Sequence, residues 1–213
     1  MDDAAPSRTI RGPNAVRRAT TRAKIMDAAV RCLAEFGYAA TSTPLVAKLA
    51  KVSRGSLLHQ FPTKVDLILA VAQHAGSAQG AFIREQIERK PPGRERFVEG
   101  VDAVWASLQR PEAVALTEIR LAARSDPELA ERYPEYMSAV AKGRLRSRER
   151  MAEGLGAPQR AGEIEVLAEL TLAALRGLAM ESIFIGQEKP QAEKVIALLK
   201  DLRGRLADEL SGT

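Results

Sequence analysis

Residues 53–60 carry the side chains with the clearest chemical signal in the chain. Ser53, Arg54, Gly55 and Ser56 are followed by His59. If Ser53 starts a helix, its first turn offers two hydroxyls, a guanidinium and unpaired backbone N–H groups, all of which suit phosphate. Arginine can read guanine in the major groove of DNA, and a glycine lets the backbone approach the duplex closely. These residue types in this order predict contact with double-stranded DNA.

Two short helices joined by a tight turn must position these side chains. Thr43 is followed by a proline and suits the N-cap of a helix that ends near residue 50. Residues 51–53 then form a turn, and a second helix capped by Ser53 runs to about residue 60. This layout predicts a helix-turn-helix. The pattern Thr63-x-x-Asp66 is a capping box that starts a long helix to about residue 89, and it places Lys64 where it faces phosphate.

Elsewhere the chain reads as all-α, with about nine helices. Apolar residues recur at spacings of three and four, and aromatic residues make up only 4% of the 213 residues. The first helix is expected from about Thr21 to Phe36, with Cys32 on its buried stripe and Gly37 ending it. Lys90-Pro91-Pro92-Gly93 is the clearest break. Further helices are expected at about 94–109, from 111, at 134–153, 161–186 and 190–210, with one more helical turn beginning at 125–128.

The net charge of +5 is distributed unevenly. Residues 1–64 hold 11 Lys and Arg against 4 Asp and Glu, a formal charge of +7, whereas residues 65–213 hold 21 against 23, or −2. A basic N-terminal third on a near-neutral body indicates a local anionic partner, and nucleic acid is the leading candidate.

Other function classes lack their sequence signals. The lone cysteine excludes an internal disulfide and, with only two histidines, makes a metal site improbable, so no metal or cofactor is expected. No apolar run approaches a membrane span and the start does not resemble a signal peptide, so we expect no membrane association and a cytoplasmic protein. The usual nucleotide-binding, hydrolase and metalloprotease motifs are missing, which disfavours an enzyme.

At these residues the sequence resembles the DNA-binding domain of TetR-family transcriptional regulators. The resemblance runs over residues 21–67, through the segments Thr21–Ala29, Phe36–Thr41, Val46–Leu57 and Phe61–Leu67. It implies a three-helix DNA-binding domain at 21–66, after a flexible basic arm at 1–20, and a larger effector-binding and dimerisation domain at 67–213. The predicted DNA contacts are Thr43, Lys51, Ser53, Arg54, Gly55, Ser56, His59 and Lys64.

Two positions depart from the family pattern. Leu58 replaces a tyrosine that touches phosphate in the family, so it is expected either to pack on the first helix or to meet a thymine methyl. Lys51 replaces a glycine of the turn. A positive φ at this position strains a lysine, but the lysine adds a positive charge beside the DNA backbone. The arm has two readings, as a DNA contact made mainly to phosphate or as a solvated tail.

The C-terminal helices are expected to form the dimer. Helices 161–186 and 190–210 have broad apolar faces that could supply half of an intermolecular four-helix bundle, or could serve the protomer's own core alone. The predicted interface residues are Leu167, Leu170, Ala174, Leu178, Leu199, Leu202 and Leu206.

A ligand pocket between helices is expected to have aliphatic walls and a few polar anchors. The candidates are Trp105, Leu108, Tyr136, Met137, Met180 and Phe184 for the walls, with Glu118 or Arg120 as the anchor. The alternating cations Lys142, Arg144, Arg146, Arg148 and Arg150 are read instead as a solvated helix with ion pairs to Glu149 and Glu153.

The sequence therefore predicts a homodimeric transcriptional regulator, a repressor that a small-molecule effector releases from a palindromic DNA operator. Effector binding would move the long helix at 63–89 and change the spacing of the recognition helices. An all-helical enzyme and a sequence-nonspecific DNA-binding protein are the alternatives.

Overall fold

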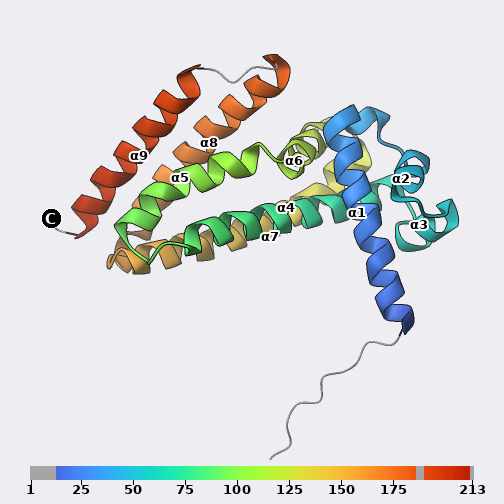
Figure 1. Ribbon diagram of the computed structural model, residues 1–213, viewed down its shortest axis with the longest axis horizontal. Coiled ribbons are helices and arrows are strands. Elements are labelled where there is room, and N and C mark those ends of the chain that lie inside the picture. The colour runs from blue at the N-terminus through green and yellow to red at the C-terminus, as the bar shows by residue number, and fades with distance from the viewer. Residues whose placement is uncertain (1–12, 186–189, 212–213) are drawn as a thin grey trace, which may run out of the picture.

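The computed structural model describes residues 13–185 and 190–211, and within these ranges the chain is helical, with no strand. The prediction of an all-α fold is confirmed. Figure 1 shows an elongated molecule with α1, α2 and α3 at one end. The long helices α4 and α7 run side by side from there to the other end, and α5, α8 and α9 lie along one side. The nine helices are α1 (Pro13–Ala40), α2 (Thr43–Ala50), α3 (Arg54–Gln60), α4 (Lys64–Glu88), α5 (Arg94–Leu108), α6 (Pro111–Ala122), α7 (Pro127–Gly154), α8 (Ala161–Ile185) and α9 (Pro190–Ser211).

Helix α1 starts eight residues before the predicted position. The predicted arm at 1–20 is therefore wrong for residues 13–20, and its first twelve residues lie outside the described part. Pro13 suits the first helical position, and the hydroxyls of Thr20 and Thr21 bond back to the carbonyls of Val16 and Arg17, so this polar stretch continues the helix. At the other end Gly37 has φ 75°, which kinks the chain where the sequence predicted the helix to end.

The helix-turn-helix forms as predicted, with one change of cap. Ser42, and not Thr43, caps α2, because its extended backbone lets its hydroxyl accept from the N–H of Leu45. Ser53 caps α3 by accepting from the N–H of Ser56 at 3.1 Å. The Thr63–Asp66 capping box that opens α4 is complete, and it fixes the direction in which α4 leaves the helix-turn-helix.

Helix α7 starts earlier than predicted and passes through Pro134, which the sequence had placed at a helix start. The carboxylate of Asp126 caps the helix by accepting from the N–H of Leu129 at 3.0 Å. The side chains of Leu129 and Tyr133 are buried in the core, and this burial holds the first turns in place although Pro134 removes one backbone hydrogen bond. A short 3-10 turn at Pro158–Arg160, absent from the prediction, leads into α8.

The N-terminal helices share one core with the rest of the molecule. Ile25, Ala29 and Leu33 of α1 are fully buried together with Ile119 of α6 and Leu129 of α7. Cys32 is buried in this core, as the sequence predicted. Two smaller clusters join α5, α8 and α9 at the other end. The helix-turn-helix is thus joined to the larger helical body through α1 and α4, which lets movement in one part reach the other.

Candidate nucleic-acid interface and ligand cavity

The start of α3 presents its polar side chains to solvent while one residue anchors the helix. Ser53, Arg54 and His59 are exposed, whereas Leu57 is completely buried in the core. Gly55 is exposed too, and a Cβ at that position would meet no atom within 4 Å. The backbone at Gly55 is therefore open to solvent, which lets a large polyanion approach it closely. Of the other predicted DNA contacts, Lys51 is exposed and Thr43 and Ser56 are half-buried.

Both departures from the family pattern have a clear structural outcome. Lys51 adopts the left-handed conformation, with φ 55° and ψ 44°, and its backbone N–H closes the last turn of α2. Its charged side chain is accordingly held beside the turn, at the cost of some backbone strain. Leu58 is half-buried and packs against the core that contains α1, so packing accounts for its apolar character.

Lys64 is bound within the protein. Its Nζ donates a hydrogen bond to the carbonyl oxygen of Tyr38 at 2.9 Å and lies 4.0 Å from the centre of the Tyr38 ring. Burial lowers the pKa of Lys64. The ammonium group thus ties the start of α4 to the end of α1, and a phosphate contact would have to share it.

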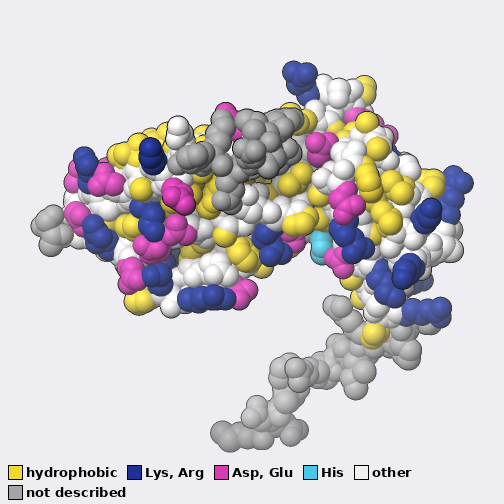
Figure 2. Space-filling view, turned by 45° about the horizontal axis from the view of Figure 1, so that its top comes forward, with side chains coloured by type: hydrophobic (Ala, Val, Ile, Leu, Met, Phe, Trp, Pro, Cys, Tyr) yellow, Lys and Arg dark blue, Asp and Glu magenta, His cyan; other side chains and the backbone are white. Residues whose placement is uncertain are grey.

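Basic side chains on α1 extend the positive surface beyond α3. Arg17, Arg18 and Lys24 are exposed, and the guanidinium of Arg22 lies over the ring of Phe61, 4.7 Å from its centre. Figure 2 shows Lys and Arg side chains gathered at this end of the molecule. The sequence assigned no DNA contact to Arg22 or Lys24, although their positive charges contributed to the N-terminal excess.

Polar contacts join the end of α1 and the start of α4, which flank the helix-turn-helix, to the helices of the larger body. The hydroxyl of Tyr38 donates to Asp126, and the backbone N–H of Tyr38 donates to Glu118 at 2.9 Å. Arg132 of α7 pairs with Asp66 of α4 at 2.8 Å. Glu118 was predicted as an effector anchor, but it lies at this junction and does not line the cavity, because α6 turns it toward α1.

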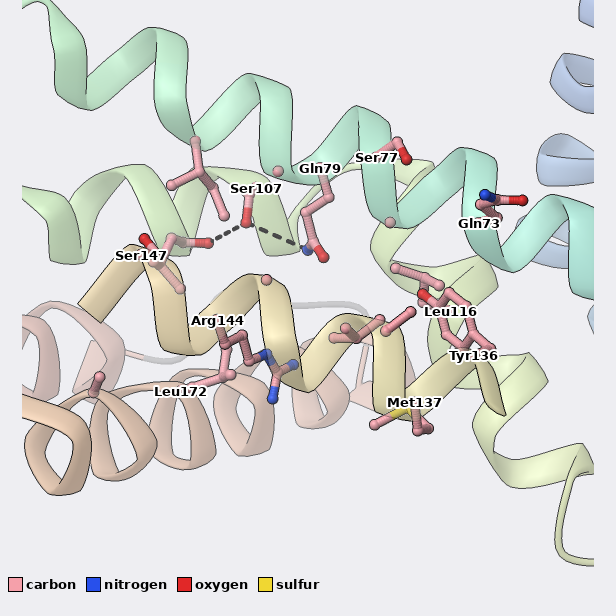
Figure 3. A pocket seen from close by; sticks show the side chains of 18 of the residues that line it. Gln73, Ser77, Gln79, Ser107, Leu116, Tyr136, Met137, Arg144, Ser147 and Leu172 are labelled. Carbon is pink, nitrogen blue, oxygen red and sulfur yellow. Dashed lines mark hydrogen bonds between the residues drawn. The ribbon is translucent and has the colours of Figure 1, made fainter. Parts of the chain in front are cut away.

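A cavity of about 840 Å³ lies among α4, α5, α6, α7, α8 and α9. Figure 3 shows Gln79 of α4 pointing toward α7, which contributes Tyr136, Met137 and Arg144. Arg120, Tyr136 and Met137 were predicted to line it and do so. Trp105 and Leu108 pack instead in the core between α5, α8 and α9, and Met180 is not among the lining residues. The side chain of Phe184 lies outside the described residues.

Several lining residues were not predicted, above all Arg144, Arg148 and Arg176. The sequence placed the first two on a solvated helix. Arg148 is in fact buried and pairs with Glu165 and Glu169 of α8, so the expected pairing with Glu149 and Glu153 is wrong. Their spacing of four residues on α7 is the signal that could have placed both arginines on one face of the helix.

The predicted dimer residues divide between the protomer core and the surface. Leu199 is buried in the core, whereas Leu167, Ala174, Leu178, Leu202 and Leu206 are half-buried. Leu170 is 50% exposed, beside Val166 at 72% on α8 and Leu198 at 57% on α9. Leu199 is therefore wrong as an interface residue, because its side chain already fills this protomer's own core.

Other kinds of site find no support in the part of the chain that the structure describes. None of its helices is long and apolar enough to cross a membrane. No group of three or more His, Cys, Asp or Glu side chains in residues 13–185 and 190–211 is placed to hold a metal ion.

An exposed helix-turn-helix at one end of a larger helical body that holds a cavity defines the class of helix-turn-helix DNA-binding proteins. Residues 25–71 match the family model described as bacterial regulatory proteins, tetR family, so the DNA-binding end of the chain carries that family's sequence pattern. An uncharacterised HTH-type transcriptional regulator of Mycobacterium tuberculosis is 29% identical over 115 residues, which span 54% of this chain and 59% of that protein. The transcriptional repressor AcnR of Corynebacterium diphtheriae is 25% identical over 84% of this chain and 90% of its own length.

Solved structures confirm the fold. A TetR family regulator from Marinobacter aquaeolei superposes with a TM-score of 0.60 at 19% identity, covering 89% of this chain and 96% of that one. The fatty acid degradation regulator FadR from Bacillus halodurans superposes with a TM-score of 0.64 at 22% identity, covering 95% of this chain and 98% of that one. These relatives are transcriptional regulators and not enzymes.

Proposed function

We propose that this protein is a dimeric transcriptional repressor that binds a palindromic DNA operator and is released from it by a small molecule in the cavity. The observation that carries the proposal is the start of α3, where Ser53, Arg54 and His59 are exposed above the buried anchor Leu57. Arg54 is placed to read a base edge, and the hydroxyls of Ser53 and Ser56 to hold phosphate. The repressor AcnR among the relatives favours repression over activation. A repressor of chromosomal genes would act in the cytoplasm, and we extend the proposal to that location.

Pairing of two protomers is supported by an apolar stripe that one protomer leaves uncovered. Val166 and Leu170 lie one turn apart on α8, and exposed Ala173 and Gly177 continue the same face. Leu198 adds an exposed apolar side chain on the neighbouring helix α9. Two such surfaces would bury one another in a four-helix bundle. A two-fold pair would then present its α3 helices to half-sites about 34–36 Å apart, which is why we infer a palindrome.

Release is supported by the way α4 and α7 connect the cavity to the helix-turn-helix. Both helices line the cavity along their middle parts and contact the DNA-binding end at their starts. Lys64 at the start of α4 holds Tyr38, which also bonds to Asp126 at the start of α7. A ligand that separates α4 from α7 would therefore shift α3 relative to its partner and weaken paired binding.

Selection of DNA by the purified full-length protein tests the first part of this proposal. A pool of random-sequence duplexes is passed through repeated rounds of binding at physiological salt, and the retained duplexes are sequenced. We expect enrichment of one inverted repeat, with half-site centres about one helical turn apart. Uniform retention of all sequences would contradict specific regulation and favour the sequence-nonspecific alternative.

A further inference from the structure

Arginine dominates the charged lining of the cavity. Eight lining residues are arginines, and one, Glu135, is acidic. The arginines are Arg84, Arg120, Arg132, Arg144, Arg148, Arg150, Arg176 and Arg203. Of these, Arg148 and Arg203 are buried and Arg144 and Arg176 are half-buried, whereas the other four are exposed. Holding the buried and half-buried charges around one cavity costs free energy unless opposite charges compensate.

Ion pairs inside the protein account for only some of these charges. Arg132 pairs with Asp66 and Glu128, and Arg148 pairs with Glu165 and Glu169. Among the residues that the structure describes, Arg144 reaches only Glu169, at 3.9 Å, and that carboxylate already bonds to Arg148.

Arg120 is exposed to solvent, whereas Arg176 is half-buried with even less compensation than Arg144. Within the described residues, neither the guanidinium of Arg120 nor that of Arg176 has a carboxylate within 4 Å. Among the same residues, the negative charge that acts on Arg176 comes from Glu169, with a smaller contribution from the weakly acidic Tyr133.

The positive charges of Arg120 and Arg144 both act on Arg176 across the cavity that the three residues line. Burial, together with the positive charges of Arg120 and Arg144, lowers the pKa of Arg176 to about 10. Burial likewise lowers the pKa of Arg144, and the charge of Arg120 adds to the effect. All three guanidinium groups also act on Tyr136, whose hydroxyl is close to Gly76 of α4. A Cβ at Gly76 would lie 2.7 Å from that hydroxyl, so the glycine leaves the phenol its place beside α4.

We propose that the cavity binds an organic anion, whose oxyanion head group lies between Arg120, Arg144 and Arg176 and whose apolar body extends along α4 and α7. Guanidinium groups bind carboxylate and phosphate oxygens in paired, charge-assisted hydrogen bonds, and the Tyr136 hydroxyl is a further donor. The inference rests on the proposed role of the cavity as the effector site, and it names the chemical class of the effector.

The remaining walls favour an organic molecule over an inorganic ion. Apolar side chains from three helices line the cavity beside the arginines, among them Leu69, Ile83, Leu116, Met137, Val140 and Leu172. A cavity of about 840 Å³ is far larger than an inorganic anion and falls within the usual range of about 300–1,000 Å³ for small-molecule sites. The anion must therefore bring an apolar body to fill the space.

Calorimetric titration with compounds that differ only in their head group tests this inference. Decanoate, decyl phosphate, decanol and decylamine share one alkyl body, and naphthoate with naphthol provides a second, aromatic body. We expect an oxyanion to bind at least about tenfold more tightly than the alcohol or the amine of the same body. Whichever of decanoate and decyl phosphate binds more tightly then identifies the preferred head group.

The variants Arg176→Gln and Arg146→Gln locate the effect. Arg146 is exposed on α7, two residues from Arg144, and does not line the cavity. Arg176→Gln should remove the preference for the oxyanion, whereas Arg146→Gln should keep it. Equal binding of alcohol and oxyanion, an oxyanion preference that survives Arg176→Gln, or binding of none of the compounds would overturn the proposal.

Thermal unfolding without any ligand gives a second, independent readout. Because the charge of Arg176 is half-buried beside like charges, Arg176→Met should raise the unfolding midpoint by about 2–4 °C. A fall in the midpoint would overturn the proposal, since it would make Arg176 a structural residue.

These titrations contain no DNA, so failure of the proposed function is recognised separately. An oxyanion that binds through Arg176 and leaves operator affinity unchanged would contradict release while sustaining the anion site. A neutral compound that binds the cavity and releases DNA would support release and contradict the anion site.

Discussion

The hydroxyl of Tyr38 donates a hydrogen bond to the carboxylate of Asp126, 88 residues further along the chain. Tyr38 belongs to the last turn of α1, directly before the helix-turn-helix. Asp126 caps α7, which lines the cavity. The same bond raises the pKa of Tyr38, to which burial contributes most, and lowers that of Asp126. The two residues thus join the DNA-binding end to a cavity helix through one polar contact.

The substitution Tyr38→Phe removes this contact and keeps the ring. We expect the free energy of unfolding in urea to fall by about 1 kcal/mol, the usual net value of such a bond. We also expect a cavity ligand to change DNA affinity less than in the wild type, because movement of α7 would reach α1 less directly. Asp126→Asn and the double variant complete the cycle that isolates the pair. Purely additive effects on stability would contradict a coupling through this bond.

Acid should weaken the junction through Asp66 and Asp126. The hydrogen bond from Arg132 lowers the pKa of Asp66, and the bond from Tyr38 lowers that of Asp126. A carboxyl group with a lower pKa in the folded state stabilises fully above its unfolded pKa of about 4. That stabilisation is lost as the pH falls through the lower folded value. Urea unfolding from about pH 5 to pH 2 should show the loss in the wild type and a smaller loss in Asp66→Asn.

The exposed carboxylate Glu131, on the same helix as Arg132, provides the control. Glu131→Gln should leave the acid dependence close to that of the wild type. A pH dependence that Asp66→Asn does not reduce would show that this ion pair contributes nothing to stability.

Much of the DNA-binding end could be predicted from the sequence because its signals are local. Ser53, Thr63 and Asp66 act on backbone groups three residues away, and Gly37 marks a backbone conformation that its own type favours. Helix α1 was predicted too short because the arginines among Pro13, Ser and Thr resembled a tail. The capping of α2 by Ser42 shows how adjacent hydroxyls leave a one-residue ambiguity.

The extension of α1 gives a prediction for DNA binding. Arg17 and Arg18 are exposed on the helix that precedes the helix-turn-helix. If both contact phosphate, replacing both with alanine should weaken binding to all sequences alike. It should also reduce the slope of log affinity against log salt by about two. The pair Arg89→Ala and Arg205→Ala, exposed arginines remote from α3, should leave the slope unchanged. An unaltered slope in the first variant would exclude the extension from the interface.

The uncovered stripe on α8 gives a prediction for assembly. A carboxylate in place of Val166 or Leu170 would lie in the middle of the proposed bundle, so Val166→Glu should shift the protein to a monomer in analytical ultracentrifugation. Binding to the palindrome should weaken with it. Leu121→Glu replaces an exposed leucine on α6, outside the proposed interface, and should remain dimeric. A dimeric Val166→Glu variant would contradict the proposed interface.

The ligand cavity was harder to predict, since it depends on which helices meet. Tyr136, Met137 and Arg120 were chosen for their types, and the packing of α4 and α7 brings them together. Glu118 and Trp105 had equally suitable side chains, yet α6 turns Glu118 toward α1, and α5 turns Trp105 into the core between α5, α8 and α9. Arg144 and Arg176 lie on different helices, 32 residues apart, so no local pattern could show that their charges share one space.

The most direct test of sequence-specific recognition by α3 is fluorescence anisotropy with two labelled duplexes. One is the palindrome enriched by the wild-type protein, and the other is a scrambled sequence of the same length and composition. We predict that the wild type binds the palindrome about a thousandfold or more tightly than the scrambled duplex. Arg54→Ala should weaken palindrome binding by about tenfold or more, with little change for the scrambled duplex. Equal affinity of the wild type for both duplexes would contradict the account.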